Sequence, residues 1–301
     1  MNVFDLVISL LSTTLRMSVP LLLAALGGMY SAKVGIMALG LEGMMLSGAF
    51  GAILGTYLSG NPYIGLLMAI AFGVIIALLH GLLTVRFHVN HIISGIGLNF
   101  LALGMTTLLM QVIWGSRGNS PQTASFGPIL PVAKGSFFGL LTPITLFAII
   151  AIVGSRYIFR RTVFGFRLSA VGENPYAAAT AGISVNRYKY IGLVLCGLLA
   201  GIAGAFLSTD HLNLFVREMT AGRGYIAVVI NILGNYNPIG ILMGSLIFGF
   251  AEALQINLQG YGVPSQIIQM IPYLITIAVL VIAVRNIRAP KSIGQHFTES
   301  R

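Results

Sequence analysis

Five polar side chains lie within long apolar runs of this sequence, where lipid or a protein core would surround them. A carboxylate at the centre of a bilayer costs about 3 kcal/mol on insertion scales, so such groups face protein or water. Polar groups inside a membrane often mark the path of a solute, and we therefore expect a polar pathway or gate built from these five residues. They are Glu42, Asn99, Asn231, Glu252 and Gln255.

Glu42 has two possible roles. It stands in KVGIMALGLEGMML beside Gly35, Gly40 and Gly43, and these glycines predict a broken or closely packed helix. The carboxylate either accepts hydrogen bonds from backbone amides at that break or takes part directly in transport. The other four candidates have the same alternative, because polar side chains also hold helices together in membranes.

Motifs for catalysis and nucleotide binding are absent from the sequence. It contains no GxxxxGK[ST], no GxSxG and no HExxH pattern. His88 and His91 stand three residues apart, but a metal site needs further ligands nearby. We therefore expect no enzyme, no bound metal and no cofactor in this chain.

The composition predicts a membrane protein. Of 301 residues, 56% are hydrophobic and 8% are charged, and the mean hydropathy is +0.92. Soluble domains carry about 25% charged residues. We therefore predict an all-α, polytopic membrane protein with about 8–10 transmembrane helices, organised as a single domain over residues 1–301.

The apolar runs define the expected spans. Residues 1–16 form either an interfacial helix or the start of the first span, and 222–234 is too short for a bilayer core of about 30 Å, which indicates a half-helix. NPYIGLLMAIAFGVIIAL from Asn61 and NPIGILMGSLIFGFAEAL from Asn237 align without gaps and suggest an inverted repeat. The spans are expected at 17–32, 36–58, 63–85, 92–114, 141–159, 188–208, 222–234, 238–257 and 266–285.

Basic residues gather in alternate connections, and the net charge is +10. The positive-inside rule places 33, 86–91, 156–189 and 285–301 in the cytoplasm, which includes the C-terminus. The opposite side receives four basic residues and two longer loops, 115–140 and 209–221, which either meet an external partner or simply connect spans. The charges form no single basic domain, so we expect no nucleic-acid partner. The four basic residues are Arg117, Lys134, Arg217 and Arg223.

A polar stretch from Arg167 to Lys189 interrupts the apolar sequence and carries its own helix signals. Asn174 is a good N-cap, Pro175 suits the first turn, and Gly182 can end the helix. The resulting helix has about two turns, whereas an isolated helix needs about 12–15 residues in water. The sequence therefore predicts a short cytoplasmic helix that its own fold or a partner protein must hold.

Three stretches resemble the permease subunits of bacterial ABC importers of the ribose-type branch. They are SAKVGIMALGLEGMMLSGAF (31–50), AVGENPYAAATAGISVNRYKYIGLVLCGLLAGIAGAFL (170–207) and GRGYIAVVINILGNYNPIGILMGSLIFGFAEALQ (222–255). The likeness spans most of residues 15–285 and is strongest to the shorter permease of basic-membrane-protein-type nucleoside importers. The sequence departs from the family at Ala38-Leu39, where a pair such as Asn-Ile is expected, and at Lys33, near which an acidic residue is frequent.

The resemblance implies a permease of the bacterial cytoplasmic membrane that forms the pathway for nucleosides, in particular purine nucleosides. Its implied partners are membrane lipid, a second permease in a heterodimer, ATP-binding subunits that hold ATP and Mg, and an extracellular or periplasmic substrate-binding protein. Within the loop 170–187, a coupling helix would dock on the ATPase. The implied coupling residues are Glu173, Asn174, Pro175, Tyr176, Ala177, Ala178, Thr180 and Gly182.

Two other functions are compatible with these residues. The same architecture could import ribose or another simple sugar. A proton-coupled secondary transporter, with Glu42 or Glu252 as the proton carrier, would also use inverted repeats and membrane carboxylates. The coupling-type helix argues against the secondary transporter, because a self-contained carrier does not need such a helix.

Overall fold

The computed structural model describes residues 3–127, 142–259, 265–283 and 288–297. These residues are mainly helical and contain no β-strand, which confirms the predicted all-α class. The helices are α1 (Val3–Ala32), α2 (Leu41–Ser59), α3 (Pro62–Gly81), η1 (Leu82–Arg86), α4 (His91–Trp114), α5 (Pro143–Arg161), α6 (Val163–Glu173), α7 (Pro175–Thr180), α8 (Val185–Ala205), η3 (Phe206–Leu212), α9 (Arg223–Leu233), α10 (Pro238–Leu258), α11 (Ser265–Gln269) and α12 (Ile271–Ala283), where η marks π-helical turns.

Seven helical segments in the described residues are long and apolar enough to cross a membrane. They include α1, the α3–η1 pair and the α8–η3 pair, and they confirm a polytopic membrane protein. The expected half-helix is α9, which has 11 residues and is too short to span a bilayer core.

Of the two alternatives for residues 1–16, the structure shows the start of the first span, because α1 begins at Val3 and continues through Pro20 as one helix of 30 residues. One expected span differs in the structure. The expected span 266–285 is instead divided into α11 and α12, which meet at Met270. Pro272 is the second residue of α12, and its missing N–H and restricted φ favour the start of a helix over a helix interior.

The helix break predicted near Glu42 is present. Residues 33–40 form turns and irregular backbone, and α2 begins only at Leu41. Gly35 has φ +82°, a conformation that glycine adopts without a steric penalty. Residues 36–40 therefore do not belong to a span, and Glu42 lies in the first turn of α2.

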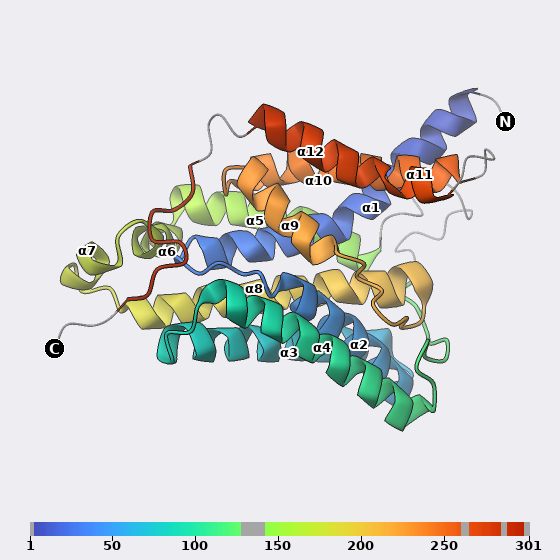
Figure 1. Ribbon diagram of the computed structural model, residues 1–301, viewed down its shortest axis with the longest axis horizontal. Helices are drawn as coiled ribbons and strands as arrows, with labels where there is room; N and C mark the ends of the chain where they lie inside the picture. The colour runs from blue at the N-terminus through green and yellow to red at the C-terminus, as the bar shows by residue number, and fades with distance from the viewer. Residues whose placement is uncertain (1–2, 128–141, 260–264, 284–287, 298–301) are drawn as a thin grey trace.

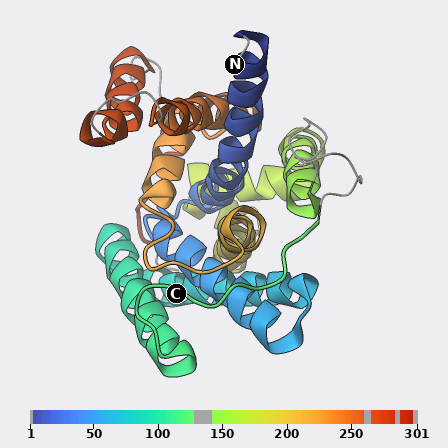
Figure 2. The same cartoon turned by 90° about the vertical axis from the view of Figure 1, so that its right-hand side faces the viewer.

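The core is built around α8, which packs against α1, α2 and α3 (Figure 2). Small residues allow these helices to approach closely. A Cβ atom on Gly48 of α2 would lie 2.5 Å from the Cα atom of Gly201 on α8, so the two backbones are in direct contact. Close contact between glycines is a common way to pack membrane helices.

The two repeated sequences form corresponding helices, α3 and α10. Each begins with an asparagine N-cap, since Asn61 accepts from the N–H of Tyr63 and Asn237 accepts from that of Ile239. Pro62 and Pro238 occupy the first turns. The two helices run in opposite directions along the molecule (Figure 1), as an inverted repeat requires.

One end of the molecule carries α6, α7 and the C-terminal residues (Figure 1, left). Residues 288–297, which we call the C-terminal strap, are bound to several connections there. Ser292 donates from its N–H to Gly172, and Gly294 donates to the carbonyl of Gly35. The basic connections therefore gather at one end, as charge counting predicts; Lys134, Arg285 and Arg301 lie outside the described residues.

The two loops expected at the opposite end are joined to each other. In the described part of 115–140, the N–H of Ser120 donates to Phe215, and that of Thr123 donates to Asn213. Asn119 and Val216 form an isolated antiparallel bridge. The two connections thus form a single surface rather than two separate loops.

Candidate functional site

Glu42 lies against the N-terminus of α9, about 180 positions away in the chain. Its Oε1 atom accepts a hydrogen bond of 2.9 Å from the N–H of Gly222, and its Oε2 atom accepts one of 2.7 Å from the N–H of Gly224. A carboxylate at a helix N-terminus satisfies unpaired amides and interacts favourably with the helix dipole. This geometry corresponds to the first of the two roles considered for Glu42.

Asn99 of α4 supports the same region. Its Oδ1 atom accepts from the N–H of Gly43 at 2.8 Å, and its Nδ2 atom donates to Leu39 and to the hydroxyl oxygen of Tyr225, each at 2.9 Å. One side chain therefore connects α4, the break before α2 and the first turn of α9. Asn99 is buried, and its three bonds use most of its capacity.

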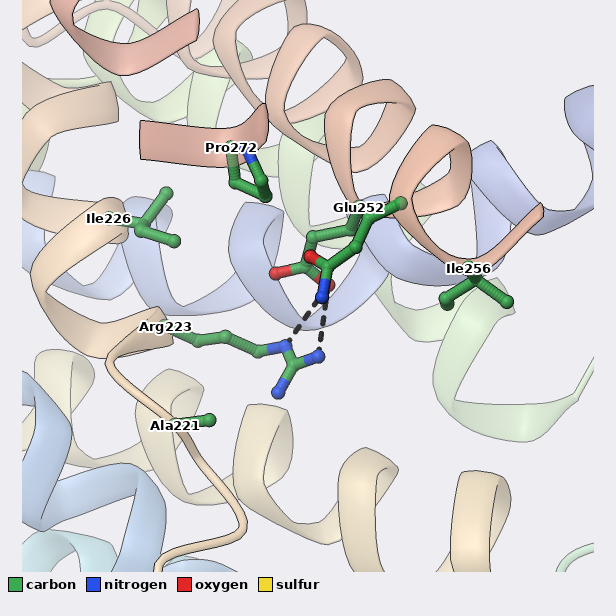
Figure 3. Close-up of a pocket in the computed structure, with 7 residues that line it drawn as sticks. Ala221, Arg223, Ile226, Glu252, Ile256 and Pro272 are labelled. Atoms are coloured by element: carbon green, nitrogen blue, oxygen red, sulfur yellow. Dashed lines mark hydrogen bonds and ion pairs between the residues drawn. The ribbon is translucent and has the colours of Figure 1, made fainter. Parts of the chain in front are cut away.

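Arg223, at the start of α9, forms an ion pair with Glu252 of α10 (Figure 3). Its Nη2 and Nε atoms donate to the Oε2 atom of Glu252 at 3.0 and 3.2 Å. The two side chains are 20% and 10% exposed. Gln255, one helical turn after Glu252, lines the same pocket of about 310 Å³ together with apolar neighbours, which are Ile226, Ile256, Pro272 and Ala221.

Asn231 is separate from this group. It lies two turns further along α9, donates to the carbonyl of Ala227 at 3.1 Å, and is 3% exposed. Within the described part of the chain, its Oδ1 atom has no hydrogen-bond partner. The structure therefore gathers four of the five candidates around the first turn of α9 and leaves the fifth in the helix packing.

The predicted helix punctuation of the polar stretch is present in α7. Asn174 accepts from the N–H of Ala177 at 3.1 Å, Pro175 occupies the first turn, and Gly182 has φ +77°. The side chains of Pro175 and Ala178 are buried against the chain. The remaining members of the expected coupling set are exposed, namely Glu173, Asn174, Tyr176, Ala177, Thr180 and Gly182.

The C-terminal strap contacts both α7 and the basic turn before α4. The rings of Phe297 and Tyr176 lie 5.1 Å apart, and the carbonyl oxygen of Phe297 lies 3.4 Å from the Nε2 atom of His88. The ring of His296 lies near those of His88 and His91, with centroids 5.5 and 5.2 Å away, edge-to-face with His88 and tilted relative to His91. No group of three metal-ligating side chains occurs in the described residues.

Three features of this region were not predicted from the sequence. Arg223 was counted only as a loop charge, although an arginine between two glycines at a helix start was a visible signal. Tyr225 was missed because a tyrosine in an apolar run has no distinctive pattern. The helix α6 was missed because Phe-Gly-Phe-Arg-Leu-Ser reads as a loop between basic residues.

A bundle of apolar helices with a half-helix, an ion pair beside it and an exposed short helix at the basic end is the architecture of a polytopic membrane protein. Residues 10–283 match the family described as branched-chain amino acid transport system / permease component. The chain belongs to this family. Its members are transport subunits, so the expectation that this chain is not itself an enzyme is confirmed.

Relatives of known name match all or most of the chain. It is 33% identical to the nucleoside ABC transporter permease protein NupC of Lactococcus lactis and 32% identical to the guanosine ABC transporter permease protein NupQ of Bacillus subtilis, over 100% of each chain. It is 27% identical to the glucose ABC transporter permease protein TsgB13 of Haloferax volcanii, over 88% of this chain and 74% of that one. The resemblance to ABC importer permeases is thereby confirmed.

The fold also resembles a solved structure, that of PsaBC from Streptococcus pneumoniae in complex with Fab. The TM-score is 0.54 at 18% identity, over 90% of this chain and 91% of the other. At this identity the likeness concerns the fold alone.

Proposed function

We propose that this chain is the permease subunit of an ABC importer for nucleosides, in particular purine nucleosides. The assignment of the transported solute rests on full-length similarity to the nucleoside permease NupC and the guanosine permease NupQ. In this proposal residues 1–301 form one permease domain in the bacterial cytoplasmic membrane. The basic end, with the C-terminus, faces the cytoplasm.

In the proposal α7 is the coupling helix, within the loop 170–187. It has six residues, too few to be stable alone in water. Its buried Pro175 and Ala178 hold it against the permease, while Ala177 is exposed and Tyr176 remains 52% exposed. The partner is an ATP-binding subunit, which supplies ATP and Mg, and the exposed face of α7 meets it.

The pocket beside α9 is the proposed pathway element. It is open on one side, and Arg223, Glu252 and Gln255 supply charged and hydrogen-bonding groups next to apolar walls. A nucleoside, with a flat base and a hydroxylated ribose, needs both kinds of contact. A second permease would close the open side and complete a heterodimer, and a binding protein would deliver solute to the surface formed by 115–127 and 213–217. Glu42 and Asn99 hold the first turn of α9 beside this pocket, and Asn231 lies two turns further along α9.

ATP-dependent uptake of labelled guanosine by the complete transporter tests the cargo. We expect unlabelled inosine to compete and ribose and glucose not to compete. Competition by glucose without inosine would assign the chain to sugar import, the second candidate, which the similarity to the glucose permease TsgB13 favours. Uptake that persists without the ATP-binding subunits but collapses with an uncoupler would instead indicate a secondary transporter.

A pair of charge variants tests the coupling helix. Ala177→Glu places a carboxylate on the exposed face of α7 and should abolish solute-stimulated ATP hydrolysis, while the permease still folds. Gln259→Glu adds the same charge at an exposed residue after α10 and should leave that activity unchanged. Normal stimulation in Ala177→Glu would exclude docking through this face.

A further inference from the structure

A pocket of about 420 Å³ opens between α6 and α8 at the basic end of the molecule. Two arginines from different elements line it, Arg167 of α6 and Arg187 of α8, and the hydroxyl-bearing side chains of Ser184 and Tyr188 lie beside them. The pocket is distinct from the one at α9 and lies just after the exposed face of α7, since Gly182 also contributes to its lining.

The pocket is positively charged. No carboxylate lines it, and residues 156–189 contain six basic residues but only one acidic residue, Glu173. Among the described residues neither arginine forms a salt bridge; Arg167 only donates to the Tyr188 hydroxyl at 3.4 Å. The Ser184 side chain makes no capping hydrogen bond at the start of α8. Several donors are therefore free to bind one anionic group.

Apolar side chains border the same donors. Phe164 and Ile191 line the pocket, and on α6 Val163 is 66% exposed and Phe166 is 72% exposed. Arginines beside exposed apolar residues are typical of the membrane interface, where the guanidinium group reaches the phosphate level while apolar surface contacts acyl chains. A free phosphate ion would use the arginines but would leave Val163 and Phe166 in water.

We propose that the pocket between α6 and α8 binds the headgroup of an anionic phospholipid. Arg167 and Arg187 contact the phosphate from two sides, Ser184 and Tyr188 donate hydrogen bonds to it, and the acyl chains lie against the apolar border. Basic pockets between transmembrane helices on the cytoplasmic side bind anionic lipid headgroups in other membrane proteins. Lipid binding at this site does not depend on which solute the transporter carries.

Native mass spectrometry of the intact transporter from nanodiscs tests the site, with phosphatidylglycerol and phosphatidylcholine as probes. We expect retention of phosphatidylglycerol but not of phosphatidylcholine. The double variant Arg167→Gln/Arg187→Gln should lower that retention about 25-fold, or about fivefold per arginine. The matched control is Arg86→Gln/Arg288→Gln, which removes the same charge from two other exposed arginines and should retain lipid normally.

Three results would overturn the proposal. Equal loss of lipid in both double variants would show general attraction to the positive end rather than a site. Displacement of the lipid by millimolar inorganic phosphate would assign the pocket to a free anion. Release of the ATP-binding subunit from Arg167→Gln/Arg187→Gln, with lipid retention unchanged, would assign the arginines to an acidic protein partner. Thermal unfolding of each variant verifies that it is folded, which we expect because these arginines are exposed.

Discussion

The carboxylate of Glu42 caps α9 from a neighbouring helix, because its two oxygens accept the N–H groups of Gly222 and Gly224 at 2.9 and 2.7 Å. The N-terminus of the half-helix α9 is therefore capped by a residue of α2 and not by a side chain of its own. Both carboxylate oxygens of Glu42 are therefore occupied by backbone N–H groups. Glu252 is likewise engaged by Arg223. These two contacts argue against the proton-coupled alternative.

Replacing Glu42 should loosen α9. Glu42→Gln keeps one acceptor but loses the charge, and hydrogen bonds to charged groups contribute about 1.5–3 kcal/mol each. We expect a lower thermal unfolding midpoint and faster hydrogen exchange in α9. The control Glu218→Gln removes an exposed carboxylate and should leave both measurements unchanged. An unchanged midpoint in Glu42→Gln would show that the cap does not stabilise the half-helix.

The contact between α2 and α8 should not tolerate a methyl group. Gly48→Ala places a Cβ atom 2.5 Å from the Cα atom of Gly201, so the helices must separate, and overpacking of this kind costs about 1–3 kcal/mol. Gly104→Ala in α4 meets nothing within 4 Å and serves as the matched control. We expect a lower thermal unfolding midpoint for Gly48→Ala than for Gly104→Ala. Equal midpoints would contradict the close packing of α2 and α8.

The ion pair between Arg223 and Glu252 should show strong coupling. Glu252→Gln leaves a largely buried guanidinium without its charged partner. We expect the free energy of unfolding to fall by about 3 kcal/mol, which is the lower end of the range for buried pairs because Arg223 is partly exposed. The double variant Arg223→Met/Glu252→Met removes both charges and should recover much of that stability. A double-mutant cycle with the single variants Arg223→Met and Glu252→Met, measured by thermal unfolding, gives the coupling energy, and additive effects would show that the pair is not linked.

The C-terminal strap should order the short helix α7. Phe297 is 6% exposed and contacts Tyr176, so Phe297→Ala should lose about 1.5–3 kcal/mol of apolar burial. We expect faster hydrogen exchange in 175–180 with little change in α2 or α3. Gln295→Ala alters an exposed strap residue and should exchange like the parent protein. Uniform destabilisation of all helices would indicate a general folding defect instead.

Lys33 predicts a pH dependence of stability. Burial lowers the pKa of the Lys33 ammonium, and the attraction of Glu173 opposes this only in part. Lys33 therefore binds its proton more weakly in the folded chain than in the unfolded chain. The free energy of unfolding consequently rises with pH between the pKa of Lys33 in the folded chain and its unfolded value of about 10.4. Lys33→Met should be more stable than the parent near pH 7, and the gap should narrow towards pH 10. A gap that widens with pH would contradict this sign.

Local sequence features were enough to predict the class, most helix positions and the cap of α7. Hydropathy, charge asymmetry and capping each depend on residues close together in the chain, so Asn174, Pro175 and Gly182 could be assigned without a structure. The break before Glu42 was predicted for the same reason, from three neighbouring glycines. The division of the last span at Met270, just before Pro272, was missed because a proline near the start of an apolar run does not by itself end it.

The partners of the polar residues were decided only by the tertiary structure. Glu42 meets Gly222 and Gly224 across about 180 positions, Asn99 meets Tyr225 across 126, and Ser292 meets Gly172 across 120. Such contacts depend on how each helix is rotated and tilted, and a bundle rich in small residues allows many rotations with the same hydropathy pattern. The sequence alone determined that polar groups must be satisfied inside the membrane. Helix packing determined which groups satisfy them.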